Sequence, residues 1–81
     1  MRSMMELLNL VVDGQITTQE QAANLLAEEA TEMAAYQNIS VEEARTKLLE
    51  DISRVSRYLS HKQADNLIEL FQAKPQPKES D

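Results

Sequence analysis

The residues from Ser40 to Leu59 carry the most restrictive pattern in this 81-residue chain. Their apolar side chains recur at intervals of three or four residues, at Val41, Ala44, Leu48, Ile52, Val55 and Leu59. At about 100° per residue, these positions fall within a stripe roughly 80° wide. A strand would alternate at every second residue, so the pattern predicts a helix that presents one narrow face to one packing partner.

Helix-start signals set the boundaries of the other elements. Thr17, Ser40 and Ser60 each follow an apolar residue and precede Glu or Gln by three positions. In such a capping box the hydroxyl accepts a hydrogen bond from a free backbone amide, and the second side chain reaches back to the cap. Together with the apolar spacing, these signals predict an all-α bundle of four helices, with two longer central ones, at 3–12, 18–36, 41–58 and 61–73.

The composition excludes several classes of protein. The chain has no cysteine, and therefore neither a disulfide framework nor a thiolate zinc site. No apolar run approaches the ~20 residues that a membrane span requires. Glu6 and Asn9 interrupt the N-terminal apolar segment, and no Ala-x-Ala cleavage site follows it. We therefore expect a cytoplasmic protein without membrane contacts, built as one domain (1–73) with a disordered, proline-containing tail (74–81).

Charge is unevenly distributed along the chain, whose net charge is −6. Residues 1–44 contain eight acidic side chains and one base, whereas residues 45–74 contain six bases and four acids. Opposite charge in the two parts favours their association, within one chain or between two. The sequence also predicts an acidic face that fits a basic groove on a partner protein, made of Glu20, Glu28, Glu32, Glu42 and Glu43.

The N-terminal helix is apolar around too much of its circumference for an ordinary surface helix. Its apolar residues cover an arc of about 220°, whereas one packing partner requires about 100°. The uncovered part exposes a contiguous aliphatic patch, which soluble monomers seldom tolerate. We therefore expect a homodimer that associates through Met4, Met5, Leu7, Leu8, Val11 and Val12. A different protein that covers the same patch is the alternative.

Glu29 projects into the apolar side of the second helix, among Ala22, Leu25 and Tyr36. A carboxylate in that position is expected to be partly buried, and a buried charge needs a partner of opposite sign. The candidates for this ion pair, between helices or between subunits, are Arg45 and Arg54.

No pattern of catalytic or metal-binding residues is complete. Residues 13–20 resemble the second half of an EF-hand calcium loop, but the preceding ligand positions fall on Asn9 and Val11, and valine cannot bind calcium. The neighbouring carboxylates have no nucleophile nearby in sequence, and His61 is the only histidine. Gly14 is the only glycine, which excludes a phosphate-binding loop. We therefore expect no enzymatic activity, no cofactor and no metal.

Direct binding of nucleic acid is disfavoured. The segment Ile16–Leu26 resembles the opening of a helix-turn-helix, but no glycine-containing turn follows it and the next helix begins with acidic residues. The one basic cluster, Arg54, Arg57 and Lys62, is small, and a pI near 4.7 opposes contacts with phosphates.

Three short segments lie within the region 25–71: Asn38–Ser40, Lys47–Leu49 and Leu67–Ile68. Their succession is similar to that of small acidic enterobacterial biofilm and two-component connector proteins, and the resemblance implies a regulatory adaptor. The residues themselves favour an acidic helical interaction module, namely a homodimeric regulator, adaptor or inhibitor of an unidentified protein. The alternative is a DNA-associated transcriptional regulator or a two-component connector-like protein.

Overall fold

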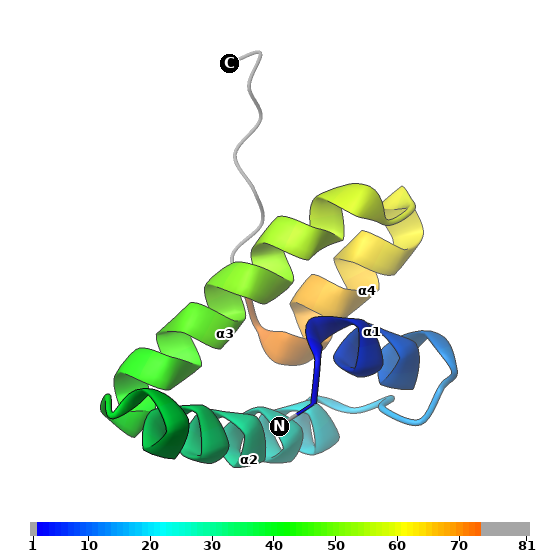
Figure 1. Ribbon diagram of the computed structural model, residues 1–81. Helices are drawn as coiled ribbons and strands as arrows, with labels where there is room; N and C mark the ends of the chain where they lie inside the picture. The colour runs from blue at the N-terminus through cyan, green and yellow to red at the C-terminus, as the bar shows by residue number, and fades with distance from the viewer. Residues whose placement is uncertain (1, 74–81) are drawn as a thin grey trace.

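Four α-helices make up the fold in the computed structural model, which describes residues 2–73 (Figure 1). They are α1 (Met4–Val12), α2 (Gln19–Gln37), α3 (Val41–Val55) and α4 (His61–Phe71), with a 3-10 turn, η1 (Ser56–Tyr58), between α3 and α4. Helices account for 79% of the described residues, and no strand occurs among them. The predicted all-α fold with four helices is therefore confirmed. The tail expected at 74–81 lies outside the described residues.

Two of the predicted helix starts are found where the sequence places them. The hydroxyl of Ser40 accepts a hydrogen bond from the amide of Glu43 at 3.0 Å, and that of Ser60 accepts from the amide of Gln63 at 3.3 Å. Each bond satisfies an amide that has no partner within its own helix.

The other two helix starts differ from the prediction. The N-cap of α2 is Thr18 instead of Thr17, because Gln21 Oε1 accepts from the backbone amides of both threonines and moves the capping box by one residue. α1 begins with a capping box that the sequence analysis missed, in which Ser3 and Glu6 exchange hydrogen bonds between side chain and backbone.

The helix predicted over 41–58 is α-helical only as far as Val55, and its last three residues form the 3-10 turn η1. α3 ends at Val55, where the hydroxyl of Ser56 donates to the carbonyl of Ser53 at 2.6 Å and the chain tightens into η1. Leu59 then adopts an extended conformation. The chain therefore reverses direction between α3 and α4, as Figure 1 shows.

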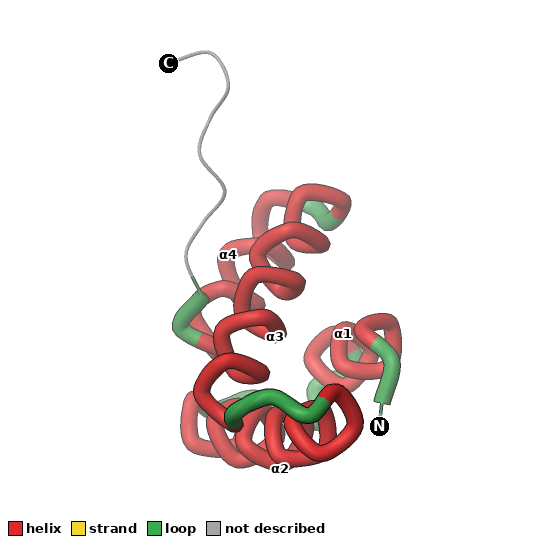
Figure 2. The backbone as a smooth tube through the Cα atoms, turned by 60° about the vertical axis from the view of Figure 1, so that its left-hand side comes forward, coloured by secondary structure: helices red, strands yellow, loops and turns green. Residues whose placement is uncertain are grey.

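α2 and α3 form the principal helix pair, and α4 packs on both of them. Figure 2 shows α3 and α4 standing over α2, with α1 to one side. The centre of the α3 stripe, Ala44, Leu48 and Ile52, is at most 2% exposed. Ala22 and Ala30 of α2 are also fully buried, and such small side chains allow helices to approach closely.

None of the helices in the described part of the chain combines the length and the apolar character that crossing a lipid bilayer requires.

Truncation of the buried stripe tests this placement of the core. Leu48→Ala and Ile52→Ala should each lower the free energy of unfolding by about 2–5 kcal/mol, because each leaves a cavity in a packed interior. Val41→Ala is the matched control, since Val41 belongs to the same stripe but is 48% exposed, and it should cost less than about 1 kcal/mol. Urea denaturation followed by circular dichroism measures all three, and equal effects would contradict the assignment of the core.

Candidate interaction surface

α1 divides its apolar arc between the core and the surface. Leu7 and Val11 are 2% and 8% exposed and belong to the core of their own chain. Met4 and Leu8 are half-buried against that core. The six residues predicted for self-association therefore do not form one surface, because two of them are used within the monomer.

Met5 and Val12 face solvent, and the half-buried Leu8 lies between them on the same edge of the helix. We call these three residues the α1 stripe. They are spaced by three and four positions, so they follow one edge of the helix. Met5 is 64% exposed and Val12 is 51% exposed. Scattered apolar residues are normal on a protein surface, but a row of large ones along a single helix is typical of an interface.

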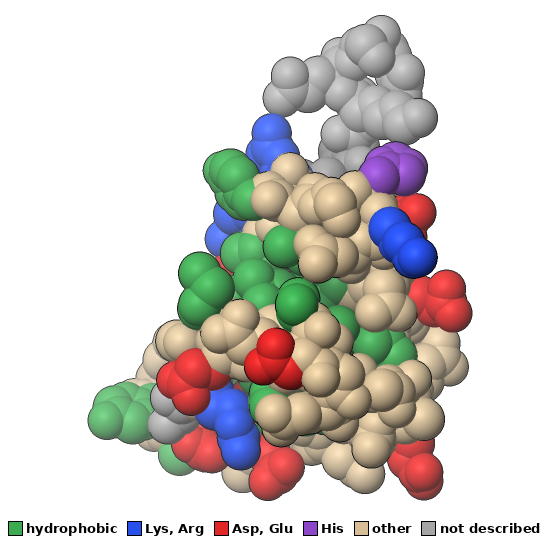
Figure 3. All heavy atoms as spheres, turned by 90° about the vertical axis from the view of Figure 1, so that its right-hand side faces the viewer, with side chains coloured by type: hydrophobic (Ala, Val, Ile, Leu, Met, Phe, Trp, Pro, Cys, Tyr) green, Lys and Arg blue, Asp and Glu red, His purple; other side chains and the backbone are tan. Residues whose placement is uncertain are grey.

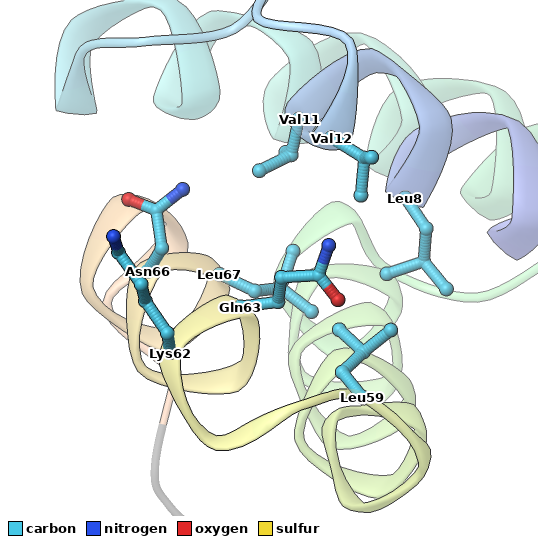
Figure 4. Close-up of a pocket in the computed structure, with 8 residues that line it drawn as sticks. All are labelled: Leu8, Val11, Val12, Leu59, Lys62, Gln63, Asn66 and Leu67. Carbon is cyan, nitrogen blue, oxygen red and sulfur yellow. The ribbon is translucent and has the colours of Figure 1, made fainter.

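A groove of about 260 Å³ lies beside the α1 stripe, and we call it the α1–α4 groove. Leu8, Val11 and Val12 line it from α1, and their side chains point toward α4 and the turn before it (Figure 4). The opposite side is lined by Leu59, Lys62, Gln63, Asn66 and Leu67. Figure 3 shows hydrophobic side chains gathered on this face between the part that carries α1 and the part that carries the start of α4.

The lining of the groove suits the side chains of another protein. Leu59 and Leu67 add to the aliphatic groups of α1, while Lys62, Gln63 and Asn66 supply one positive charge and two amides. An apolar centre with a polar rim is the usual composition of a protein–protein interface. Among residues 2–73, no group of three or more His, Cys, Asp or Glu side chains could hold a metal ion.

A second hollow, of about 390 Å³, lies between α3 and the residues that follow α4. Leu49 is the only large aliphatic side chain among the residues that line it, which are Thr46, Leu49, Glu50, Ser53, Gln72 and Ala73. It is larger than the α1–α4 groove, but no large apolar side chain that is more than half exposed lies in its lining, whereas Val12 lies in that of the groove.

The five glutamates of the predicted acidic face are all exposed. Glu20 lies in the first turn of α2, and Glu42 and Glu43 lie in the first turn of α3. Negative charge stabilises a helix at that end, so these three have a local structural role in addition to any role in binding. Glu28 and Glu32 extend the negative charge along α2, and in Figure 3 most of the visible acidic side chains lie below the hydrophobic area.

Glu29 is more completely buried than predicted, at 1% exposure, and its cation is Arg2 and neither Arg45 nor Arg54. Its two carboxylate oxygens accept hydrogen bonds from the backbone amide and from Nη1 of Arg2, both at 3.0 Å. Arg54 instead contacts the neighbouring Asp51 on α3 at 2.8 Å. The sequence does contain one signal for the correct partner, because Arg2 is the only base in residues 1–44.

Comparison of this chain with protein-family models, with curated proteins and with solved structures gives no match. The regulatory role implied by the resemblance to biofilm and connector proteins therefore stays a prediction. What the surface binds is inferred below from its own residues.

Replacing one arginine at a time compares how much the buried Arg2–Glu29 pair and the exposed Arg54–Asp51 pair contribute to the free energy of unfolding. Arg2→Ala should lower the free energy of unfolding by about 1–3 kcal/mol, because it leaves a charged carboxylate buried with one hydrogen bond fewer. Arg54→Ala breaks a pair whose side chains are 62% and 41% exposed, so it should cost less than about 0.5 kcal/mol. Chemical denaturation measures the free energy of unfolding of the two variants. A loss for Arg2→Ala no larger than that for Arg54→Ala would contradict a buried ion pair that stabilises the fold.

Proposed function

We propose that this protein is a small protein–protein interaction module that pairs with a second copy of itself through the α1 stripe and the α1–α4 groove. In that state it acts as an adaptor or inhibitor by binding another protein. The observation that carries the proposal is the position of the α1 stripe. Leu8 and Val12 belong both to the α1 stripe and to the lining of the groove. The stripe that one copy would present and the groove that would receive it therefore lie side by side.

This adjacency favours a symmetric pair. A two-fold axis close to α1 brings the stripe of one copy to the groove of the other, and the same contact is then made twice. Met5 and Val12, which are more than half exposed in the single chain, become covered by apolar groups. Their removal from water is the main source of favourable free energy in such an association.

The charges along the two edges are also complementary. Glu6 and Asp13 are the charged residues of α1 and of the position that follows it, and both are exposed. Lys62 is the charged residue in the lining of the groove. In a pair in which the stripe of one copy lies on the groove of the other, the acidic residues of one copy lie near Lys62 of the other. Such charge pairs at the rim of an interface fix its orientation more than they raise its affinity.

The acidic surface supplies the second part of the proposed function. The exposed Glu20, Glu28, Glu42 and Glu43 lie outside the groove lining, so a dimer that forms through the groove leaves them at the surface. A negative surface of this kind attracts a basic surface on a partner and repels the phosphates of nucleic acid. This supports a protein as the partner and does not support DNA.

A matched pair of valine substitutions tests self-association. We expect wild-type protein to sediment as a dimer at micromolar concentration and Val12→Glu to sediment as a monomer near 9.2 kDa, because the glutamate places a charge in the proposed contact. Val41→Glu is the control, since Val41 is a terminal helix residue of nearly equal exposure, 48% against 51%. It should leave the dimer intact.

Circular dichroism of both variants checks that the helices are retained. A wild-type monomer at every concentration up to the millimolar range, or equal loss of the dimer in both variants, would contradict the proposed function.

A further inference from the structure

We infer that the contact between Arg2 and Glu29 is a latch that fastens the N-terminal end of α1 to α2 and thereby forms one wall of the α1–α4 groove. The inference rests on the proposed function where it concerns binding, because it names what controls the same surface. The latch itself is a property of the single chain, and it can be tested without any partner.

α1 is short, so its ends need fixed points in addition to the core contacts of Leu7 and Val11. It has nine residues, and an isolated helix of that length is marginally stable in water. It packs principally on α4, through the side of the helix that contains Leu7 and Val11. Its C-terminal end is fixed by the following turn, in which the amides of Gln15 and Ile16 donate to the carbonyl of Leu10.

The N-terminal end of α1 depends on Glu29. The chain passes α2 before α1 begins (Figure 1), and at this point both the backbone amide and the guanidinium of Arg2 donate to the Glu29 carboxylate. Because one of the two donors belongs to the main chain, the contact fixes the path of the backbone one residue before the Ser3 cap. A contact made only by the flexible side chain of Arg2 would not fix the path of the backbone.

The two partners of the latch differ in how they depend on it. Arg2 is 45% exposed, so its guanidinium can be hydrated when the contact opens, whereas the Glu29 side chain is 1% exposed and cannot. Opening therefore requires α1 to move far enough for water to reach the carboxylate. That movement displaces Leu8 more than Val11 and Val12, whose end of the helix is fixed by the following turn, so the complete groove wall exists while the latch is closed.

Replacement of Glu29 by an apolar residue of similar size distinguishes two effects, namely loss of the latch and loss of stability in the core. Glu29→Met removes the acceptor of both hydrogen bonds but fills the same buried space with a flexible apolar chain. A buried ionic group replaced in this way commonly leaves a protein as stable or more stable. We therefore expect the midpoint of thermal unfolding to stay unchanged or to rise, while α1 becomes loose.

Hydrogen exchange measured by mass spectrometry provides the readout. We compare Glu29→Met with wild-type Glu29, both in the Val12→Glu background, so that self-association adds no protection. The amides of α1 should exchange roughly tenfold faster or more in Glu29→Met, while the buried amides of α3 keep their rates. A residue that only supported the core would change both helices together.

Substitution of Arg2 supplies the matched control. Both Arg2→Lys and Arg2→Ala keep the main-chain donor, but only Arg2→Lys keeps a cation for the carboxylate, so it should retain more of the protection of α1 than Arg2→Ala does. Unchanged exchange of α1 in Glu29→Met, or equal acceleration in α1 and α3, would overturn the latch.

A sedimentation measurement of Glu29→Met with native Val12 connects the latch to binding. If wild-type protein dimerises, the variant should dissociate at a higher concentration, and about tenfold higher where the competent form of α1 is populated roughly a third of the time in each of the two copies. An unchanged dimer despite faster exchange would overturn the link between latch and groove. Faster exchange with a monomeric wild type would leave the latch in place and reject the dimer.

Discussion

The close packing of α3 against α2 is the contact on which the rest of the molecule depends. Leu48 and Ile52 of α3 are almost completely buried, and fully buried alanines on α2 allow the two helices to lie close together. In a chain this small, a few such side chains supply much of the stability. α4 then packs on this pair through Leu67 and Phe71, and α1 packs on α4.

This order of dependence explains why the candidate surface lies at α1. Among the described helices, α1 makes the fewest contacts with the others, and it also carries two of the most exposed large apolar residues, Met5 and Val12. Elements of low local stability are commonly the ones that bind and move. The ion pair between Arg2 and Glu29 connects the residues before α1 to α2 directly, so the proposed surface lies next to a contact made by one buried carboxylate.

The features that could be predicted from sequence are those encoded locally. The spacing around Leu48 predicts α3, and hydroxyl caps such as Ser40 predict where helices begin, because both signals extend over a few residues. The end of α3 could not be predicted, since it depends on how Ser56 bonds within a turn that the apolar pattern does not distinguish from helix. The partner of Glu29 lies 27 residues away, and the groove combines α1 with α4. Both require a knowledge of which helices meet, and helical periodicity carries no such information.

We propose that α1 and the start of α4 form a surface for association. The most direct test is a dilution series of the wild-type protein followed by amide chemical shifts in nuclear magnetic resonance, since each residue then reports on its own surroundings. The account predicts concentration-dependent shifts for Met5, Leu8, Val12, Leu59 and Lys62, with little change around Val41 and Tyr36 at the far ends of α3 and α2. Shifts that do not depend on concentration, or that cluster around Val41 and Tyr36, would contradict it.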